Sequence, residues 1–134
     1  MTKNEQLVRD AMQVIWNECD LSRVNEFYAD NFEADYPHTD WGNGLEGLRN
    51  LATQVHNDLP GYTEHIEELI DAGDKIVVIL SISGSHPVTG DEISFRDVTI
   101  ITIKDGKIIN QRGTGDLLTL YEKLNMITLT SNTQ

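Results

Sequence analysis

The sequence is short of cysteine, of basic residues and of long apolar runs, and each shortage excludes a class of protein. A single cysteine, Cys19, excludes an intrachain disulfide and a zinc site built from several cysteines. Ten Lys and Arg stand against 22 Asp and Glu, and the net charge of −12 argues against nucleic-acid and anionic-membrane partners. No apolar run approaches the roughly 20 residues that cross a bilayer. Residues 1–6 lack the apolar segment of a secretory signal, so we expect a cytoplasmic protein.

The remaining composition is that of an ordinary globular protein. Of the 134 residues, 39% are hydrophobic and 24% are charged, which are common proportions for a soluble domain. A chain of this length predicts one domain over residues 1–134, with one core. Cys19 is expected on the apolar face of a helix, as a buried and unreactive thiol.

Three helices are expected in the first half of the chain. Thr2 and Glu5 form a capping-box pattern, which predicts a helix start. A short second helix is expected around residues 24–28. Asn43, with Glu46 three residues later, is expected to begin a third helix that ends before residues 60–61. Apolar residues at helical spacing give the first and third helices one buried stripe each: Leu7, Val8, Ala11, Met12, Ile15 and Cys19, then Leu45, Leu48, Leu51, Ala52, Val55 and Leu59.

The second half of the chain predicts strands. Residues 62–70, 75–85, 93–103 and 107–112 alternate or run apolar with β-branched residues, and short turns separate them. Asp105 and Gly106 are typical of a type I′ hairpin turn. A brief extended piece is expected at residues 31–36, and a short helix at 117–124. The pattern predicts an α+β fold, in which helices cover a curved antiparallel sheet and leave an internal pocket.

Several short motifs carry a resemblance to a known family. They are Gly73-Asp74-Lys75-Ile76-Val77, then Gly84-Ser85-His86 with Thr89-Gly90, and Asp105-Gly106-Lys107-Ile108 followed by Asp116, Leu117-Leu118 and Leu124. In these motifs and in element order the chain resembles the SnoaL-like polyketide cyclase family. The resemblance implies one SnoaL-like domain with the cone-shaped fold (cystatin-like, nuclear transport factor 2-like or ketosteroid-isomerase-like), and Asp116 at the family's catalytic acid/base position. Asn110 stands where Glu is usual, and Arg112 where Trp is usual.

Asp116 has two interpretations. As a general base it would line the pocket, partly desolvated, with its pKa raised toward neutrality. An Asp directly before a helix is also a favoured N-cap, and capping would lower its pKa instead. The family position favours the catalytic role.

Two histidines are further candidates for catalysis. His86 ends the longest strand, in phase with its inward residues, and could hydrogen-bond a substrate oxygen; a partly exposed strand end is the alternative. His38 lies with Tyr36 and Trp41 in a loop over the expected pocket, where all three could contact substrate or simply form turns. The spacing of acidic residues around His38 matches no established metal site, so no metal is expected.

Charged residues within the strands are candidate binding groups. Arg96 and Asp97 face opposite sides of their strand, and by parity Asp97 shares a face with Phe95, Thr99 and Ile101. Asp97 would then be half of a buried ion pair with Arg112 or a second catalytic carboxylate. Arg112 could stabilise an enolate or bind a carboxylate, or it could face outward. Trp16 and Tyr28 are candidate substrate contacts, with core packing as the alternative.

Two functions remain open. The first is an enzyme without metal or organic cofactor, in which Asp116, with His86 or His38, promotes cyclisation, isomerisation or hydration of a small-to-medium apolar carbonyl compound. The second is a non-catalytic module of the same fold that binds a small molecule or dimerises. A homodimer is expected in either case, because such a fold exposes a sheet face.

Overall fold

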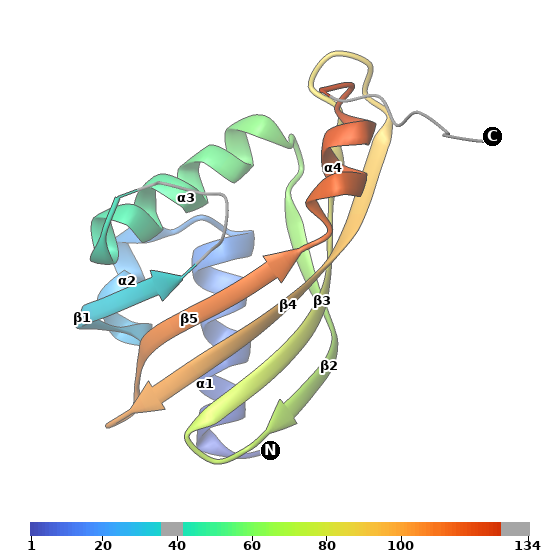
Figure 1. The fold of residues 1–134 in the computed structure, drawn as a ribbon. Coiled ribbons are helices and arrows are strands. Elements are labelled where there is room, and N and C mark those ends of the chain that lie inside the picture. Colours follow the sequence, from blue (N-terminus) through green and yellow to red (C-terminus); the bar gives the residue numbers. More distant parts are fainter. Residues whose placement is uncertain (36–41, 127–134) are drawn as a thin grey trace.

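The computed structural model describes residues 1–35 and 42–126. Helices come first, a five-stranded sheet follows, and a short helix ends the described chain (Figure 1). The helices are α1 (Lys3–Ala11), α2 (Val24–Phe27), α3 (Gly44–Asp58) and α4 (Leu117–Lys123), with a π-helical turn at Met12–Asn17 and a 3₁₀ turn at Leu21–Arg23. The strands are β1 (Tyr28–Asp35), β2 (Thr63–Asp71), β3 (Lys75–Ser85), β4 (Glu92–Lys104) and β5 (Lys107–Gly115). No described helix is long and apolar enough to cross a membrane.

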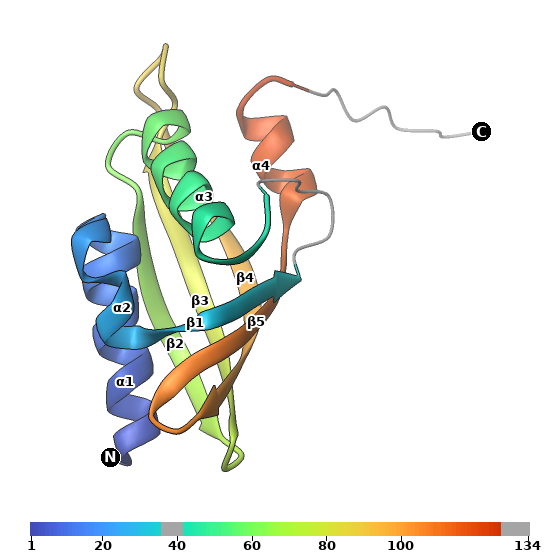
Figure 2. The same cartoon turned by 90° about the vertical axis from the view of Figure 1, so that its left-hand side faces the viewer.

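The sheet confirms the expected α+β fold and adds one pairing to it. Its strand order is β1-β5-β4-β3-β2, in which β2 to β5 form the predicted antiparallel meander. The extended piece expected at residues 31–36 begins earlier, at Tyr28, and forms an edge strand parallel to β5. The sheet curves without closing, and α1 and α3 lie along its concave side (Figures 1 and 2).

The ends of the elements follow local chemistry. The Thr2 hydroxyl accepts a hydrogen bond from the Glu5 N–H at 3.1 Å, so the predicted cap is confirmed. Asn43 occupies the N-cap position of α3, but its side chain makes no capping bond. Asp105 and Gly106 have φ of 53° and 75°, as the predicted type I′ turn requires.

Cys19 corrects one expectation. The helical stripe ends at the π-helical turn, and Cys19 follows it in the left-handed region with φ of 54°. Its thiol is partly buried against the core and lies 3.8 Å from the Ala52 carbonyl oxygen. Burial raises the pKa of the thiol, which keeps it protonated and agrees with an unreactive role.

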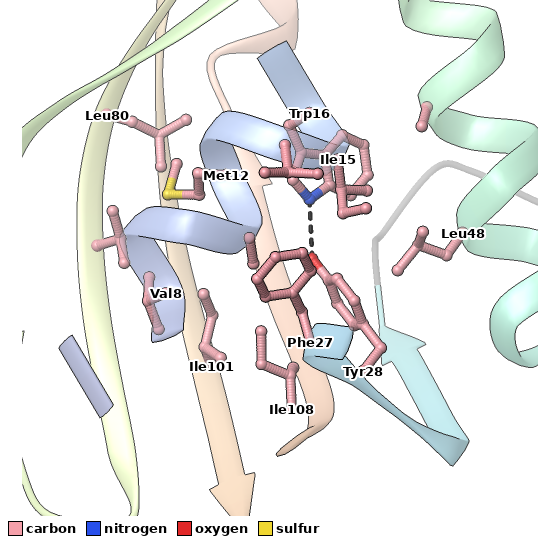
Figure 3. Close-up of a cluster of buried hydrophobic side chains, with 14 of the residues drawn as sticks. Val8, Met12, Ile15, Trp16, Phe27, Tyr28, Leu48, Leu80, Ile101 and Ile108 are labelled. Atoms are coloured by element: carbon pink, nitrogen blue, oxygen red, sulfur yellow. Dashed lines mark hydrogen bonds between the residues drawn. The ribbon is translucent and has the colours of Figure 1, made fainter. Parts of the chain in front are cut away.

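The core lies between the helices and the concave face of the sheet. Val8, Ile15 and Ile108 are fully buried there, and the ring of Tyr28 meets Phe32 edge-on at 5.0 Å between centroids. Figure 3 shows the Trp16 indole N–H donating to the Tyr28 hydroxyl, at 2.9 Å, inside this cluster. The helices are therefore fixed to the sheet by apolar packing and by a buried hydrogen bond.

Candidate active site

A cavity of about 350 Å³ opens between the concave face of the sheet and the helices. Most of its wall is apolar, and every described helix except α2 contributes to it. Representative apolar side chains are Met12, Leu51, Val55, Leu80, Phe95 and Leu120. A recess of this size with few polar groups is typical of a small-molecule site.

Strand alternation decides which residues of β4 and β5 face the cavity. Phe95, Asp97, Thr99 and Ile101 all line it, which confirms the parity prediction for β4. On β5, Gly115 lies opposite Asp97 in the antiparallel register. A Cβ on Gly115 would lie 3.7 Å from Oδ2 of Asp97, in ordinary van der Waals contact, so the glycine puts no side chain against that carboxyl group.

Asp97 is the acid at the centre of this wall. Its Oδ1 accepts a 3.4 Å hydrogen bond from the Thr99 hydroxyl, and the Val98 N–H also donates to the carboxyl group. Burial outweighs both bonds and raises the pKa of Asp97 to about 6. Among the described residues, no cation pairs with it.

The ion pair expected between Asp97 and Arg112 is therefore wrong. The Arg112 side chain is 65% exposed on the outer face of the sheet, where its Nε lies 3.8 Å from Oδ2 of Asp35. Arg112 also does not line the cavity, so the alternative that it faces outward is confirmed.

Glu64 is a second cavity acid that the sequence analysis missed. Its Oε2 accepts a hydrogen bond from the Tyr62 hydroxyl at 2.5 Å. Burial raises the pKa of Glu64 to about 7, and the charge of Asp97 adds to that rise. The Asn17 side chain accepts from the Glu64 N–H at 2.7 Å and donates to its carbonyl oxygen at 3.0 Å, which fixes the backbone. Strand parity was the available signal, because Glu64 lies two residues from buried Tyr62 and two from partly buried Ile66, and therefore shares their face.

Trp16 and Tyr28 both lie on the cavity wall, as a substrate contact requires. Both are buried, and their polar atoms are used within the wall: Trp16 donates to Tyr28, and the Tyr28 hydroxyl lies 3.4 Å from Oε1 of Gln111. Burial raises the pKa of Tyr28. Each can offer a ligand an apolar surface; their contact with substrate stays a prediction.

Asp116 caps α4 and faces solvent. Its carboxylate accepts from the Thr119 N–H at 3.1 Å and from the Thr119 hydroxyl at 2.6 Å. These bonds lower its pKa, so the expected rise toward neutrality is wrong and the N-cap interpretation is confirmed. Asp116 does not line the cavity, although the adjoining Gly115 does. Its catalytic role stays a prediction.

The histidines do not enter the described wall. His86 lies in the turn after β3, not at its inward end, and its Nδ1 accepts from the N–H groups of Val88 at 3.0 Å and Thr89 at 3.2 Å. His56 lies behind the wall, with its Nε2 2.6 Å from the Trp16 carbonyl oxygen. His38, Tyr36 and Trp41 lie outside the described residues. Within the described part of the chain, no group of three or more His, Cys, Asp or Glu could hold a metal ion.

Comparison with known sequences decides the family. The sequence pattern of the SnoaL-like polyketide cyclases matches residues 6–124. The chain belongs to the SnoaL-like polyketide cyclase family. A comparison with curated proteins gives no match.

Solved structures share the fold of this SnoaL-like chain. A candidate polyketide cyclase from Bacillus cereus ATCC 10987 is 29% identical, with a TM-score of 0.79 over 85% of this chain and 75% of that one. A candidate polyketide cyclase from Acidithiobacillus ferrooxidans is 17% identical, with a TM-score of 0.85 over 95% and 97% of the two chains. TsrD from Streptomyces laurentii is 22% identical, with a TM-score of 0.79 over 93% and 96%.

Proposed function

We propose that this protein is an acid/base enzyme that cyclises, isomerises or hydrates a small-to-medium apolar carbonyl compound in the cavity, with Asp97 transferring the proton. The observation that carries the proposal is the position of the Asp97 carboxyl group, on the apolar wall of the cavity and next to Gly115, which has no side chain. Membership in the SnoaL-like polyketide cyclase family supports a cyclase or isomerase type of reaction.

Burial in the apolar wall raises the pKa of Asp97, which suits this carboxyl group to proton transfer near neutral pH. An ionised Asp97 can accept a proton from the carbon next to a carbonyl group, and the C–H electron pair then forms the enolate. The enolate carbon next attacks a second carbonyl carbon of the same molecule, and the alkoxide formed there takes the proton back from the Asp97 acid, which gives cyclisation. Alternatively, the Asp97 acid reprotonates the enolate at another carbon, which gives isomerisation. A base with a pKa of about 6 is mostly ionised at pH 7 yet more basic than an ordinary aspartate. Tyr121 on the same wall offers a hydroxyl donor to the developing oxyanion.

The test compares the acid in the cavity with the acid at the helix cap. A panel of β-keto esters and enones is incubated in D₂O, and NMR follows deuterium uptake at the acidic carbon together with product formation. Asp97→Asn is expected to lower the rate by about 10²- to 10⁴-fold, the usual contribution of a general base. Asp116→Asn keeps an acceptor for the α4 cap and is expected to retain the native rate.

Two results contradict the assignment. Equal rates for the native protein and Asp97→Asn would remove Asp97 from the mechanism. A loss confined to Asp116→Asn would return the role of base to the residue at the family position.

A non-catalytic binding module is the second candidate. It is favoured by Asp116, because the residue at the family's acid/base position is used as a helix cap and faces solvent. A module of this kind binds the carbonyl compounds in the cavity without deuterium uptake by any of them. Isothermal titration calorimetry on the same panel identifies the compounds that bind, and the deuterium-uptake measurement then separates the two candidates, because only the enzyme exchanges the acidic hydrogen of a bound compound.

A further inference from the structure

The ionisable side chains on the described wall of the cavity are all acids or phenols. Its carboxyl groups belong to Asp58, Glu64 and Asp97, and its phenols to Tyr28, Tyr62 and Tyr121. No described Lys, Arg or His lines it. Asp58 is exposed and receives a hydrogen bond from Gln54, whereas Glu64 and Asp97 are set deeper among apolar side chains.

The arginines of these strands lie on the opposite face of the sheet. Arg96, next to Asp97 on β4, reaches Glu67 with its Nε 3.3 Å from Oε2. Arg112 on β5 is directed toward Asp35. Positive charge is therefore held on the outer face, and the two inward carboxyl groups receive no counter-charge from the described chain.

We propose that Glu64 and Asp97 make the cavity selective for an apolar ligand that carries a protonated amine, and that they reject the matching carboxylate. This selectivity concerns the charge of the ligand that the cavity binds. It rests on the proposed function only because it takes the cavity as the substrate site. A carbonyl compound that also carries a protonated amine satisfies both proposals.

Desolvation of the two carboxyl groups strengthens the preference for a cationic ligand. A carboxylate on an apolar wall is costly when it lacks a partner, and a charge-assisted hydrogen bond from an ammonium group offsets that cost. Phe95, Tyr62 and Tyr121 also line this wall, and aromatic rings attract cations. A ligand carboxylate meets like charge instead, and this repulsion excludes it.

The Glu64 carboxyl group is held in place for this role. The Tyr62 hydroxyl anchors one of its oxygens, and Asn17 binds both backbone polar groups of the residue. The raised pKa values of Glu64 and Asp97 agree with carboxyl groups that lack a counter-charge. At pH 8 both groups are mainly ionised, so the selectivity is measured there.

The test uses three ligands that share one naphthalene skeleton. They are 2-(1-naphthyl)ethylamine, 2-(1-naphthyl)ethanol and 1-naphthylacetic acid, and calorimetry measures their dissociation constants at pH 8. The native protein is expected to bind the amine at least about tenfold more tightly than the alcohol, and the acid at least about tenfold more weakly, as expected for one charge-assisted contact. Glu64→Gln and Asp97→Asn are each expected to lower the ratio of the acid's dissociation constant to the amine's by about tenfold or more.

Matched controls show whether the cavity acids cause the effect. Glu67→Gln removes a carboxylate from the outer face of the same strand as Glu64 and is expected to leave the ratio unchanged. Unchanged affinity for the alcohol shows that Glu64→Gln and Asp97→Asn keep the cavity intact.

Three results overturn the proposal. They are an amine advantage over the alcohol below about threefold, a ratio between amine and acid that persists in both cavity variants, and the absence of binding by all three ligands. Selective binding without deuterium uptake from carbonyl substrates would instead overturn only the proposed reaction.

Discussion

Glu64 should make the folded protein less stable as pH rises from 5 to 8. In the unfolded chain this carboxyl group ionises near its ordinary pKa of 4.5, whereas burial holds its pKa at about 7 in the fold. Between these values the unfolded state binds fewer protons than the folded state. The free energy of unfolding therefore falls through this window, and the loss is complete above pH 7. The two pKa values correspond to a loss of about 3 kcal/mol.

Glu64→Gln removes this loss while keeping an acceptor for the Tyr62 hydroxyl. We expect the variant to be about 1–3 kcal/mol more stable than the native protein at pH 8, and close to it at pH 4.5. Urea denaturation at half-unit pH steps measures both curves. Glu67→Gln is the control, because that carboxylate lies on the outer face beside Arg96 and Ser81. Native and Glu64→Gln curves that run parallel from pH 5 to 8 would show that Glu64 does not cause the loss of stability.

Three further substitutions test the packing and the cap. Gly84→Ala places a Cβ 3.0 Å from the Leu59 Cβ and 3.2 Å from the Pro60 carbonyl oxygen. We expect it to lower the free energy of unfolding by about 1–3 kcal/mol in urea denaturation. An unchanged midpoint would show that the end of α3 can move aside. Phe32→Ala empties a site that is 1% exposed, and should cost about 3–5 kcal/mol by the same measurement unless the core collapses into it. Asp116→Ala should lower the melting temperature in a circular dichroism scan, whereas Asp116→Asn, which keeps the acceptor, should not; equal losses for the two would contradict a capping role.

Much of the fold could be predicted from local patterns. The cap at Thr2, the turn at Asp105 and Gly106, and the four-stranded meander are signalled by neighbouring residues, and the structure confirms them. The parallel pairing of β1 with β5 could not be predicted in this way, because it joins segments about 80 residues apart. The π-helical turn that moves Cys19 off the helix also has no local sequence signal.

Strand parity predicts the side that Asp97 faces, whereas the side that Arg112 faces depends on a bulge. Asp97 lies in a regular stretch of β4, so alternation places it correctly. On β5, Thr102 pairs with Asn110 but Ile103 pairs with Ile108, so one extra residue interrupts the alternation. Such a bulge reverses which side the following residues face, and it turns Arg112 outward. Glu64 has the inward parity of β2, but this strand carries several acids, so the sequence alone does not distinguish the one that faces the cavity.

We infer that Asp97 is a desolvated acid in the cavity that transfers a proton near neutral pH. Carboxyl ¹³C NMR titration of the native protein tests it most directly, with Asp97→Asn to assign the resonance. We expect Asp97 to titrate near pH 6, well above Asp116, whose pKa the helix cap lowers. An Asp97 resonance that titrates together with that of Asp116 would contradict this inference.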